Sequence, residues 1–374
     1  MEIPLIGFGT ARLRGVEGVA AIRAALEAGC RHFDTAKIYG TEEILGDVIS
    51  SAMSDGTLKN REEVFVTSKL WNDDHRPENV AAACRASLAR LKLSYIDLYL
   101  VHWPAAWRKG TVGCPDSTVG MMDTWRAMEL LVDQGLVKQI GVSNFGQLRL
   151  TRLLSEARIP PFCNQVEIHP RLQQHGLVNF CQRNGITVTA WSPLAKGRTD
   201  DSSSVLTKIA AKRGISLSQL ILLWHISRRI VAIPRSSNPR HIDENMSVWK
   251  CAATSINGSI GIGLSREEGC IAINSTADSA QIRQRRSMED SAANNAAPAA
   301  AAAAAAINGS DGFSLLSNDE LDAIRKVDRG QRLILDFVGV FEDTGWPWPF
   351  VGTVLCALAR IVWGLIPFRI DLKM

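Results

Sequence analysis

The chain has 374 residues, of which 46% are hydrophobic and 21% are charged, a composition typical of soluble globular proteins and unlike that of disordered or disulfide-rich chains. Its formal net charge of +4 is small and spread along the sequence, so we expect no nucleic-acid partner. The eight cysteines form no C-x-x-C pair and show no metal-ligand spacing, which predicts reduced thiols, no bound metal and a cytoplasmic protein. The first residues lack the pattern of a signal peptide, and we expect a monomer.

Short apolar or β-branched runs alternate with amphipathic stretches between Pro4 and Val248. This alternation predicts a parallel sheet with crossover helices. The predicted strands are Leu5–Phe8, Arg31–Asp34, Val64–Ser68, Ile96–Val101, Lys138–Val142, Cys163–Glu167, Thr187–Ala190 and Ile230–Ile233. The predicted helices are Gly18–Ala28, Glu42–Met53, Pro77–Leu91, Val119–Gln134, Gln147–Ser155, Leu177–Arg183, Ser203–Lys212 and Leu217–Ser227. Eight such units within residues 1–250 favour an α/β chain closed into a (β/α)8 TIM barrel over an open doubly wound sheet.

The sequence changes character after Lys250. Residues 251–312 are rich in Gly, Ser, Asn and Ala, and they predict either a low-complexity flexible insertion before the last helix or an artefact of the gene model. Residues 313–336 predict the C-terminal helix of the barrel, in which Ser317 and Glu320 fit a capping box. Residues 337–374 make a C-terminal extension. Its apolar stretch 350–368 has Arg360 near the centre and is interpreted either as a packed or disordered tail or as a hydrophobic membrane anchor.

Polar residues follow the predicted strands at the points where the apolar runs stop, and in a parallel barrel these strand ends meet at one mouth. Four residues of this region are Asp34, Tyr39, Lys69 and His102. A tyrosine is about three pH units too weak an acid to donate a proton readily at neutral pH, and a neighbouring lysine ammonium lowers its pKa. A carboxylate keeps that lysine charged, and a neutral imidazole can orient a carbonyl group. The four residues predict an acid-base site, although Asp34 alone also fits a helix N-cap and Tyr39 alone a packed core residue.

Seven short segments extend this pattern along the chain. They are Asp34-Thr-Ala-Lys-Ile-Tyr39-Gly-Thr-Glu, Ser68-Lys69-Leu-Trp, Leu100-Val-His102-Trp-Pro, Gly141-Val-Ser-Asn-Phe145, Asn164-Gln-Val-Glu167, Trp191-Ser-Pro-Leu194 and Ile233-Pro-Arg-Ser236. In this order and spacing they resemble the aldo-keto reductase family from Pro4 to about Asp336. The resemblance implies NADPH-dependent reduction of aldehydes or ketones to alcohols. It also implies that Asp34, Tyr39, Lys69 and His102 are the catalytic tetrad and that Tyr39 donates the proton.

The resemblance further implies a site for NADPH (NADP+) along the later strand ends. From the nicotinamide to the adenine, its residues are Ser143, Asn144, Gln165, Trp191, Ser192, Leu194, Arg235, Ser236, His241, Glu244 and Asn245. Trp191 stands where the family usually has a tyrosine, and we expect its ring to stack on the nicotinamide. His241 stands where an arginine is common. Arg235 can contact the 2′-phosphate through two hydrogen bonds, which favours NADPH over NADH.

Trp71 and Trp103 follow tetrad motifs and are predicted to wall a pocket for a small carbonyl substrate. The loop after the segment Trp191-Ser-Pro-Leu-Ala-Lys-Gly-Arg198 is short. Because longer versions of this loop in the family fold over the cofactor, the resemblance implies an open site with fast cofactor exchange. Two alternatives remain at this point. The chain could be an NADPH-binding sensor or scaffold with little turnover, or a membrane-tethered reductase held by residues 350–368.

Overall fold

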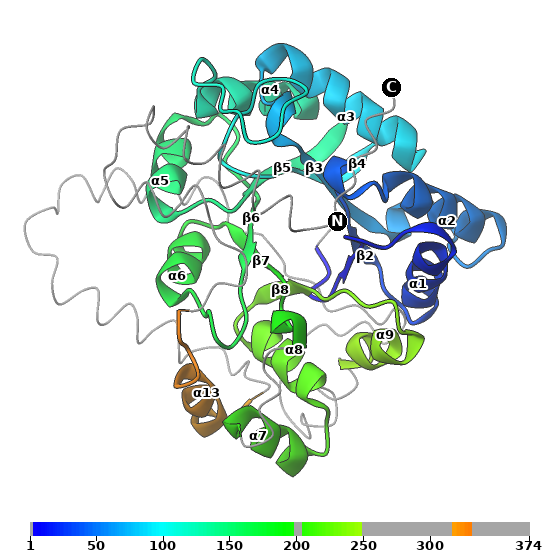
Figure 1. The fold of residues 1–374 in the computed structure, drawn as a ribbon, viewed down its shortest axis with the longest axis vertical. Helices are drawn as coiled ribbons and strands as arrows, with labels where there is room; N and C mark the ends of the chain where they lie inside the picture. The colour runs from blue at the N-terminus through cyan, green and yellow to red at the C-terminus, as the bar shows by residue number, and fades with distance from the viewer. Residues whose placement is uncertain (1–2, 198–203, 249–315, 331–374) are drawn as a thin grey trace, which may run out of the picture.

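The computed structural model describes residues 3–197, 204–248 and 316–330, and eight parallel strands form the centre of this part of the chain (Figure 1). Each strand pairs with the next one in the sequence. The strands are β1 Phe8–Gly9, β2 His32–Asp34, β3 Phe65–Leu70, β4 Ile96–Val101, β5 Val137–Ser143, β6 Cys163–Glu167, β7 Thr187–Trp191 and β8 Ile230–Ile233. The predicted (β/α)8 barrel is therefore confirmed.

The barrel closes between its first and last strands. The amide of Gly7 donates to the carbonyl of Ala232 at 2.9 Å, and the amide of Ala232 donates to the carbonyl of Leu5 at 2.8 Å. Ile6 forms a parallel bridge with Ala232. The first strand was predicted too early in the sequence, because Leu5 to Gly7 bond to β8 and the pairing with β2 begins only at Phe8.

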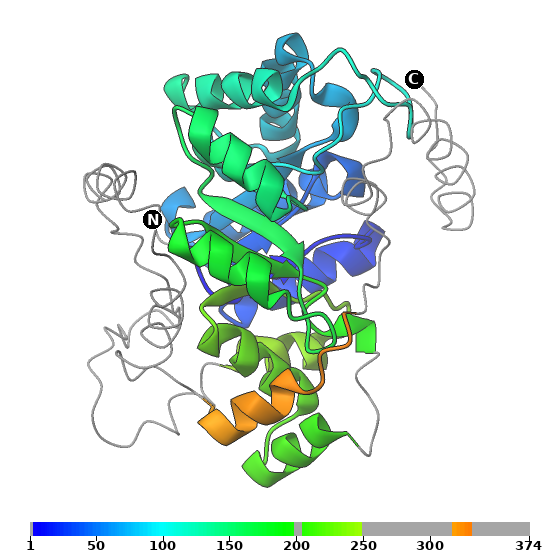
Figure 2. The ribbon, with the colours of Figure 1, turned by 90° about the vertical axis from the view of Figure 1, so that its left-hand side faces the viewer.

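Helices surround the strands in a ring (Figures 1 and 2). The α-helices are α1 Gly15–Glu27, α2 Glu42–Ser54, α3 Pro77–Leu91, α4 Met121–Asp133, α5 Gln147–Glu156, α6 His175–Arg183, α7 Val205–Arg213, α8 Leu217–Ser227, α9 Pro239–Met246 and α13 Asn318–Arg325. Short 3-10 turns are η1 Lys37–Tyr39, η2 Arg61–Glu63, η3 Asn72–Asp74 and η4 Ala195–Gly197. Both α7 and α8 lie between β7 and β8, so the helix that follows β8 is α9.

Helix α9 was not predicted, because only two of its eight residues, Ile242 and Met246, are both apolar and buried. Its start nevertheless carries two helix signals. Pro239 occupies the first turn, where a missing amide hydrogen costs nothing, and the Asn238 side chain accepts a hydrogen bond from the Arg240 amide at 3.0 Å. The helix packs against α1 and α8.

Strands β3, β4, β6 and β8 are buried at every position. This follows from a parallel sheet whose two faces are both covered, and it explains the nearly continuous apolar runs of β4 and β8. Strands β3 and β6 are equally buried but include polar residues. The barrel interior also holds polar side chains. His32 and Thr67 share a hydrogen bond of 3.1 Å between Nε2 and Oγ1. They lie two residues before Asp34 and Lys69 on the same strands, and therefore on the same face.

Helix α13 packs against α7 beside the barrel (Figure 2). Its predicted capping box is present, since the Ser317 hydroxyl accepts from the Glu320 amide and the Glu320 carboxylate accepts from the Ser317 amide. Glu320 also forms two hydrogen bonds with the Arg213 guanidinium, at 2.7 and 2.6 Å. The predicted insertion 251–312, the extension 337–374 with its apolar stretch, and residues 198–203 lie outside the described residues. Within residues 3–197, 204–248 and 316–330, no helix is long and apolar enough to cross a membrane.

Candidate active site

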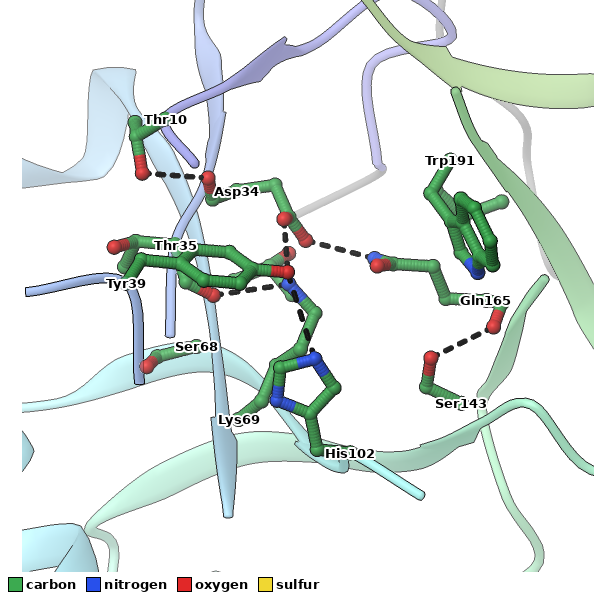
Figure 3. A network of polar contacts seen from close by, with 12 residues as sticks. Thr10, Asp34, Thr35, Tyr39, Ser68, Lys69, His102, Ser143, Gln165 and Trp191 are labelled. Carbon is green, nitrogen blue, oxygen red and sulfur yellow. Dashed lines mark hydrogen bonds and ion pairs between the residues drawn. The ribbon is translucent and has the colours of Figure 1, made fainter. Parts of the chain in front are cut away.

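Asp34 and Lys69 form a buried ion pair at the carboxyl end of the barrel (Figure 3). Lys69 Nζ donates to Asp34 Oδ1 at 2.5 Å and to the Thr35 carbonyl at 3.0 Å. The second carboxylate oxygen of Asp34 accepts from Gln165 Nε2 at 2.7 Å. Each charged group thus has further hydrogen-bond partners, which is the condition under which a buried pair is tolerated.

Tyr39 lies next to this pair, on the turn η1 (Figure 3). Lys69 Nζ is 4.9 Å from the centre of the Tyr39 ring. The Tyr39 hydroxyl is 3.5 Å from His102 Nε2, and His102 is the first residue after β4. The structure therefore brings together the four side chains that the sequence placed on three separate strand ends.

His102 is neutral at physiological pH. Burial lowers its pKa well below 6.5, and the nearby Lys69 lowers it further. Its Nδ1 atom is buried without a hydrogen-bond partner among the described residues. An unpaired buried N–H costs more than an unpaired ring nitrogen without a proton, so the proton belongs on Nε2, which faces Tyr39. The imidazole can then donate a hydrogen bond into the mouth of the barrel.

The expected acidification of Tyr39 is not found. Burial raises the Tyr39 pKa above 10, and Lys69 opposes this increase without cancelling it. Burial alone would lower the pKa of Lys69, but Asp34 and Tyr39 outweigh it and raise that pKa. Tyr39 therefore keeps its proton, and Lys69 its charge, throughout the neutral range.

Three buried threonine hydroxyls support the Tyr39 turn, and they were not predicted from the sequence. Thr41 Oγ1 is 2.9 Å from both Thr10 Oγ1 and Thr35 Oγ1, and Thr10 also donates to the Asp34 carbonyl at 3.0 Å. All three side chains are buried. They connect the ends of β1 and β2 to the start of α2. A useful signal was the position of Thr35 and Thr41 within the Asp34–Glu42 motif.

Aromatic rings continue the site beyond His102. The buried Trp71 ring lies edge-on to His102 at 5.0 Å and to Trp107 at 5.5 Å between ring centres. Trp103 is half-buried and follows His102 directly. Trp71 and Trp103 were predicted as pocket walls, whereas the ring that lies beside Trp71 in the structure is Trp107.

The residues assigned to the nicotinamide lie next to the tetrad. Ser143 Oγ donates to the Gln165 carbonyl at 2.8 Å (Figure 3). Trp191 Nε1 donates to Asn144 Oδ1 at 3.0 Å, and Asn144 Nδ2 donates to the His102 carbonyl at 3.0 Å. Trp191 is thus attached to the site through Asn144. Ser192 and Leu194 are half-buried beyond it.

The residues assigned to the phosphate and adenine cluster after β8. Arg235 is exposed, and its guanidinium donates to the Arg12 carbonyl at 3.2 Å. Ser236 Oγ accepts from the Asn238 amide at 3.1 Å, and His241 is exposed. Glu244 accepts a hydrogen bond from the Ser216 hydroxyl. Buried Asn245 has a side-chain oxygen with no hydrogen-bond partner among the described residues, a free acceptor suited to an amine donor.

Four buried histidines predict loss of stability in acid. Burial lowers the pKa of His32, His75 and His225 to about 4 and that of His102 well below 6.5. These residues stay neutral in the folded protein but take up protons below pH 6.5 when unfolded. Their contribution to the free energy of unfolding is therefore fully present above pH 6.5. It falls by roughly 1.4 kcal/mol per pH unit for each histidine as the pH drops toward 4. Urea unfolding at about pH 7 and pH 5 checks this, and equal free energies of unfolding would contradict it.

No group of three or more potential metal ligands occurs within residues 3–197, 204–248 and 316–330. A closed parallel barrel whose carboxyl end holds a buried carboxylate, lysine, tyrosine and histidine has the architecture of a TIM-barrel enzyme with an acid-base site. Comparison with known proteins identifies the class further. A sequence profile of the aldo/keto reductase family matches residues 5–256.

Aldo-keto reductase family 1 member A1 of Mus musculus is 41% identical over 265 residues, which cover 66% of this chain and 82% of the mouse protein. The human protein of that name is 40% identical over the same lengths. The crystal structure of Bombyx mori aldo-keto reductase AKR2E4 in complex with NADP has a TM-score of 0.68 and 31% identity, and the match covers 91% of this chain and 94% of that one. This chain belongs to the aldo/keto reductase family, and its general activity is carbonyl reduction.

Proposed function

We propose that the chain reduces aldehydes or ketones to alcohols with NADPH, and that Tyr39 donates the proton to the carbonyl oxygen. The observation that carries this proposal is the juxtaposition of Tyr39, the Lys69–Asp34 pair and His102 at the carboxyl end of the barrel. Two similar solved structures contain NADP or NADPH. We place the catalytic and cofactor sites in one barrel domain, residues 1–250.

The residues present fit NADPH at both ends. Exposed Arg235 offers a guanidinium to a phosphate, and the Asn245 oxygen offers an acceptor to the adenine amine. Ser143, Asn144 and Gln165 would hold the carboxamide, and the Trp191 ring would cover the nicotinamide. When bound, NADPH supplies the hydride that is added to the carbonyl carbon.

The chain's own residues then act on the carbonyl oxygen. His102 donates from Nε2 and orients the oxygen toward the Tyr39 hydroxyl. Tyr39 transfers its proton to the oxygen as negative charge develops there. Lys69 lies under the Tyr39 ring and stabilises the tyrosinate that remains, because its positive charge is 4.9 Å from the ring centre. Asp34 keeps Lys69 in place and charged.

Replacement of Arg235 by methionine should weaken NADPH binding selectively. A charged hydrogen bond to phosphate contributes about 1.5 to 3 kcal/mol, so we expect a rise of roughly tenfold or more in the Kd for NADPH. The Kd for NADH, which lacks the 2′-phosphate, should change little. Calorimetric titration with both cofactors measures this. Arg152→Met on α5, where Arg152 pairs with Glu156, is the matched control, and an equal loss for both cofactors would reject a 2′-phosphate contact.

A substrate panel tests the proposed function. NADPH oxidation should be measured with DL-glyceraldehyde, methylglyoxal, 4-nitrobenzaldehyde and 2-keto sugars, and the alcohol product should be identified. We expect turnover of at least one of these carbonyl compounds. Tight NADPH binding with no turnover of any of them would reject the enzymatic proposal and favour a cofactor sensor or scaffold.

A further inference from the structure

Two neighbouring aspartates lie at the mouth of the barrel, outside the tetrad. Asp73 and Asp74 belong to the turn η3, which follows β3 and Trp71. The Asp74 side chain is only 2% exposed, yet it contacts two lysines. Lys37 Nζ donates to Asp74 Oδ2 at 2.5 Å, and Lys109 Nζ donates to Oδ1. One buried carboxylate therefore holds two cations on its two oxygens.

The two lysines come from the parts of the mouth that carry the reacting groups. Lys37 begins η1, the turn that ends with Tyr39. Lys109 lies in the loop between β4 and α4, which begins at His102. Asp73 reinforces the same connection, since it accepts from Lys37 Nζ at 3.3 Å and from the Gly110 amide at 3.2 Å. The carboxylates of Asp73 and Asp74 on η3 thus bind both the Tyr39 turn and the β4–α4 loop.

The β4–α4 loop is also attached to η3 through its backbone. Trp107 forms an antiparallel bridge with Pro115, so this part of the loop is a hairpin. The Trp107 amide donates to the Asn72 carbonyl at 2.8 Å. The Trp107 ring packs edge-on to Trp71, which in turn packs edge-on to His102. Any contact that holds the hairpin against η3 therefore also holds the Trp107 and Trp71 rings beside His102.

We propose that Asp74 is a positioning residue. Through Lys37 it sets the orientation of Tyr39, and through Lys109 it sets the position of the Trp107 ring. It would thereby determine selectivity for bulky aromatic carbonyl substrates, and this step rests on the proposed function. Isolated exposed ion pairs contribute little. Asp74 differs from them because its carboxylate is desolvated and bound from two sides, so that loss of either lysine leaves its charge poorly compensated.

Kinetics of two variants test the proposal. Lys109→Met should raise KM for 4-nitrobenzaldehyde about tenfold and change KM for the small DL-glyceraldehyde by less than about twofold, because only the larger substrate reaches the Trp107 wall. Lys37→Met should lower kcat for both substrates about tenfold with little change in KM, because a small displacement of Tyr39 slows proton transfer. Asp74→Asn should combine the two effects, and Asp74→Glu, which keeps the charge, should restore part of each.

A second measurement does not depend on activity. Arg108 and Lys109 are exposed, so trypsin cleavage after Arg108 reports how firmly the hairpin is held. We expect cleavage about tenfold faster in Asp74→Asn and in Lys109→Met than in the wild type. Lys92→Met is the control, since Lys92 forms an exposed pair with Asp47 away from the site, with both side chains 52% exposed.

The outcomes separate this proposal from the proposed function. Absence of turnover in the wild type would reject the function, and the trypsin rates would still test the attachment of the hairpin. The role of Asp74 would be overturned if Asp74→Asn and Lys109→Met were both cleaved at the wild-type rate and both kept the wild-type ratio of KM for 4-nitrobenzaldehyde to KM for DL-glyceraldehyde. An equal rise in KM for both aldehydes in Lys109→Met would overturn the assignment of selectivity.

Discussion

Replacement of Tyr39 by phenylalanine is expected to lower kcat for carbonyl reduction by about 10²- to 10⁴-fold, the range that a positioned general acid contributes. The variant loses only the hydroxyl that lies 3.5 Å from His102 Nε2, and the ring that covers Lys69 remains. NADPH affinity and thermal stability should therefore be close to those of the wild type. Because burial raises the Tyr39 pKa above 10, this loss should be observed throughout the neutral pH range.

The matched control is Tyr95→Phe. Tyr95 lies outside the site, between the side chains of Arg61 and Lys138, whose charges are 4.4 and 4.2 Å from its ring centre. Because Tyr95 contacts none of the four residues of the acid-base site, removal of its hydroxyl should leave kcat unchanged. Steady-state NADPH oxidation in both variants provides the comparison. Wild-type turnover by Tyr39→Phe would exclude Tyr39 as the proton donor.

Replacement of Lys69 by methionine should impair both folding and turnover. The Lys69 side chain is fully buried and its ammonium is 2.5 Å from Asp34 Oδ1. Removing one partner of such a pair leaves an uncompensated buried charge, which typically costs about 3 to 5 kcal/mol. The tyrosinate would also lose its stabilising cation, so we expect a fall in kcat similar to that of Tyr39→Phe.

The double variant Asp34→Asn/Lys69→Met separates these two effects. It has no buried charge at this position, so it should recover most of the lost free energy of unfolding and none of the activity. Urea denaturation of the single and double variants measures the difference. Lys92→Met removes a lysine from an exposed pair and should cost no more than about 1 kcal/mol. If the double variant were as unstable as Lys69→Met, the ion-pair explanation would be wrong.

The strands, and the meeting of Asp34, Tyr39, Lys69 and His102 at one mouth, were predictable from sequence because their signals are local. Strands buried on both faces give apolar runs, and the side chains after those runs must converge when the barrel closes. Strands β4, β6 and β8 have the predicted bounds. Helix α9 was missed because its few buried residues give almost no apolar pattern, although Pro239 and Asn238 marked its beginning.

Other features of the site depend on contacts between distant parts of the chain. Lys37 and Asp74 are 37 residues apart, and Asp74 and Lys109 are 35 residues apart, so no local pattern connects them. The direction of the Tyr39 pKa shift could not be predicted from the sequence either. It depends on whether the pKa increase caused by desolvation is larger than the decrease caused by the Lys69 charge. Trp107 lies beside Trp71 because the β4–α4 hairpin packs against η3.

The most direct test of the proposed reaction is to follow the transferred hydrogen. The wild-type protein should be incubated with NADPH deuterated at the transferring position of C4 and with the best aldehyde of the panel, and the alcohol should be analysed by mass spectrometry. Hydride transfer from NADPH to the carbonyl carbon predicts one deuterium on the carbinol carbon for each NADPH consumed. An alcohol without deuterium, or bound NADPH that is never consumed, would contradict it.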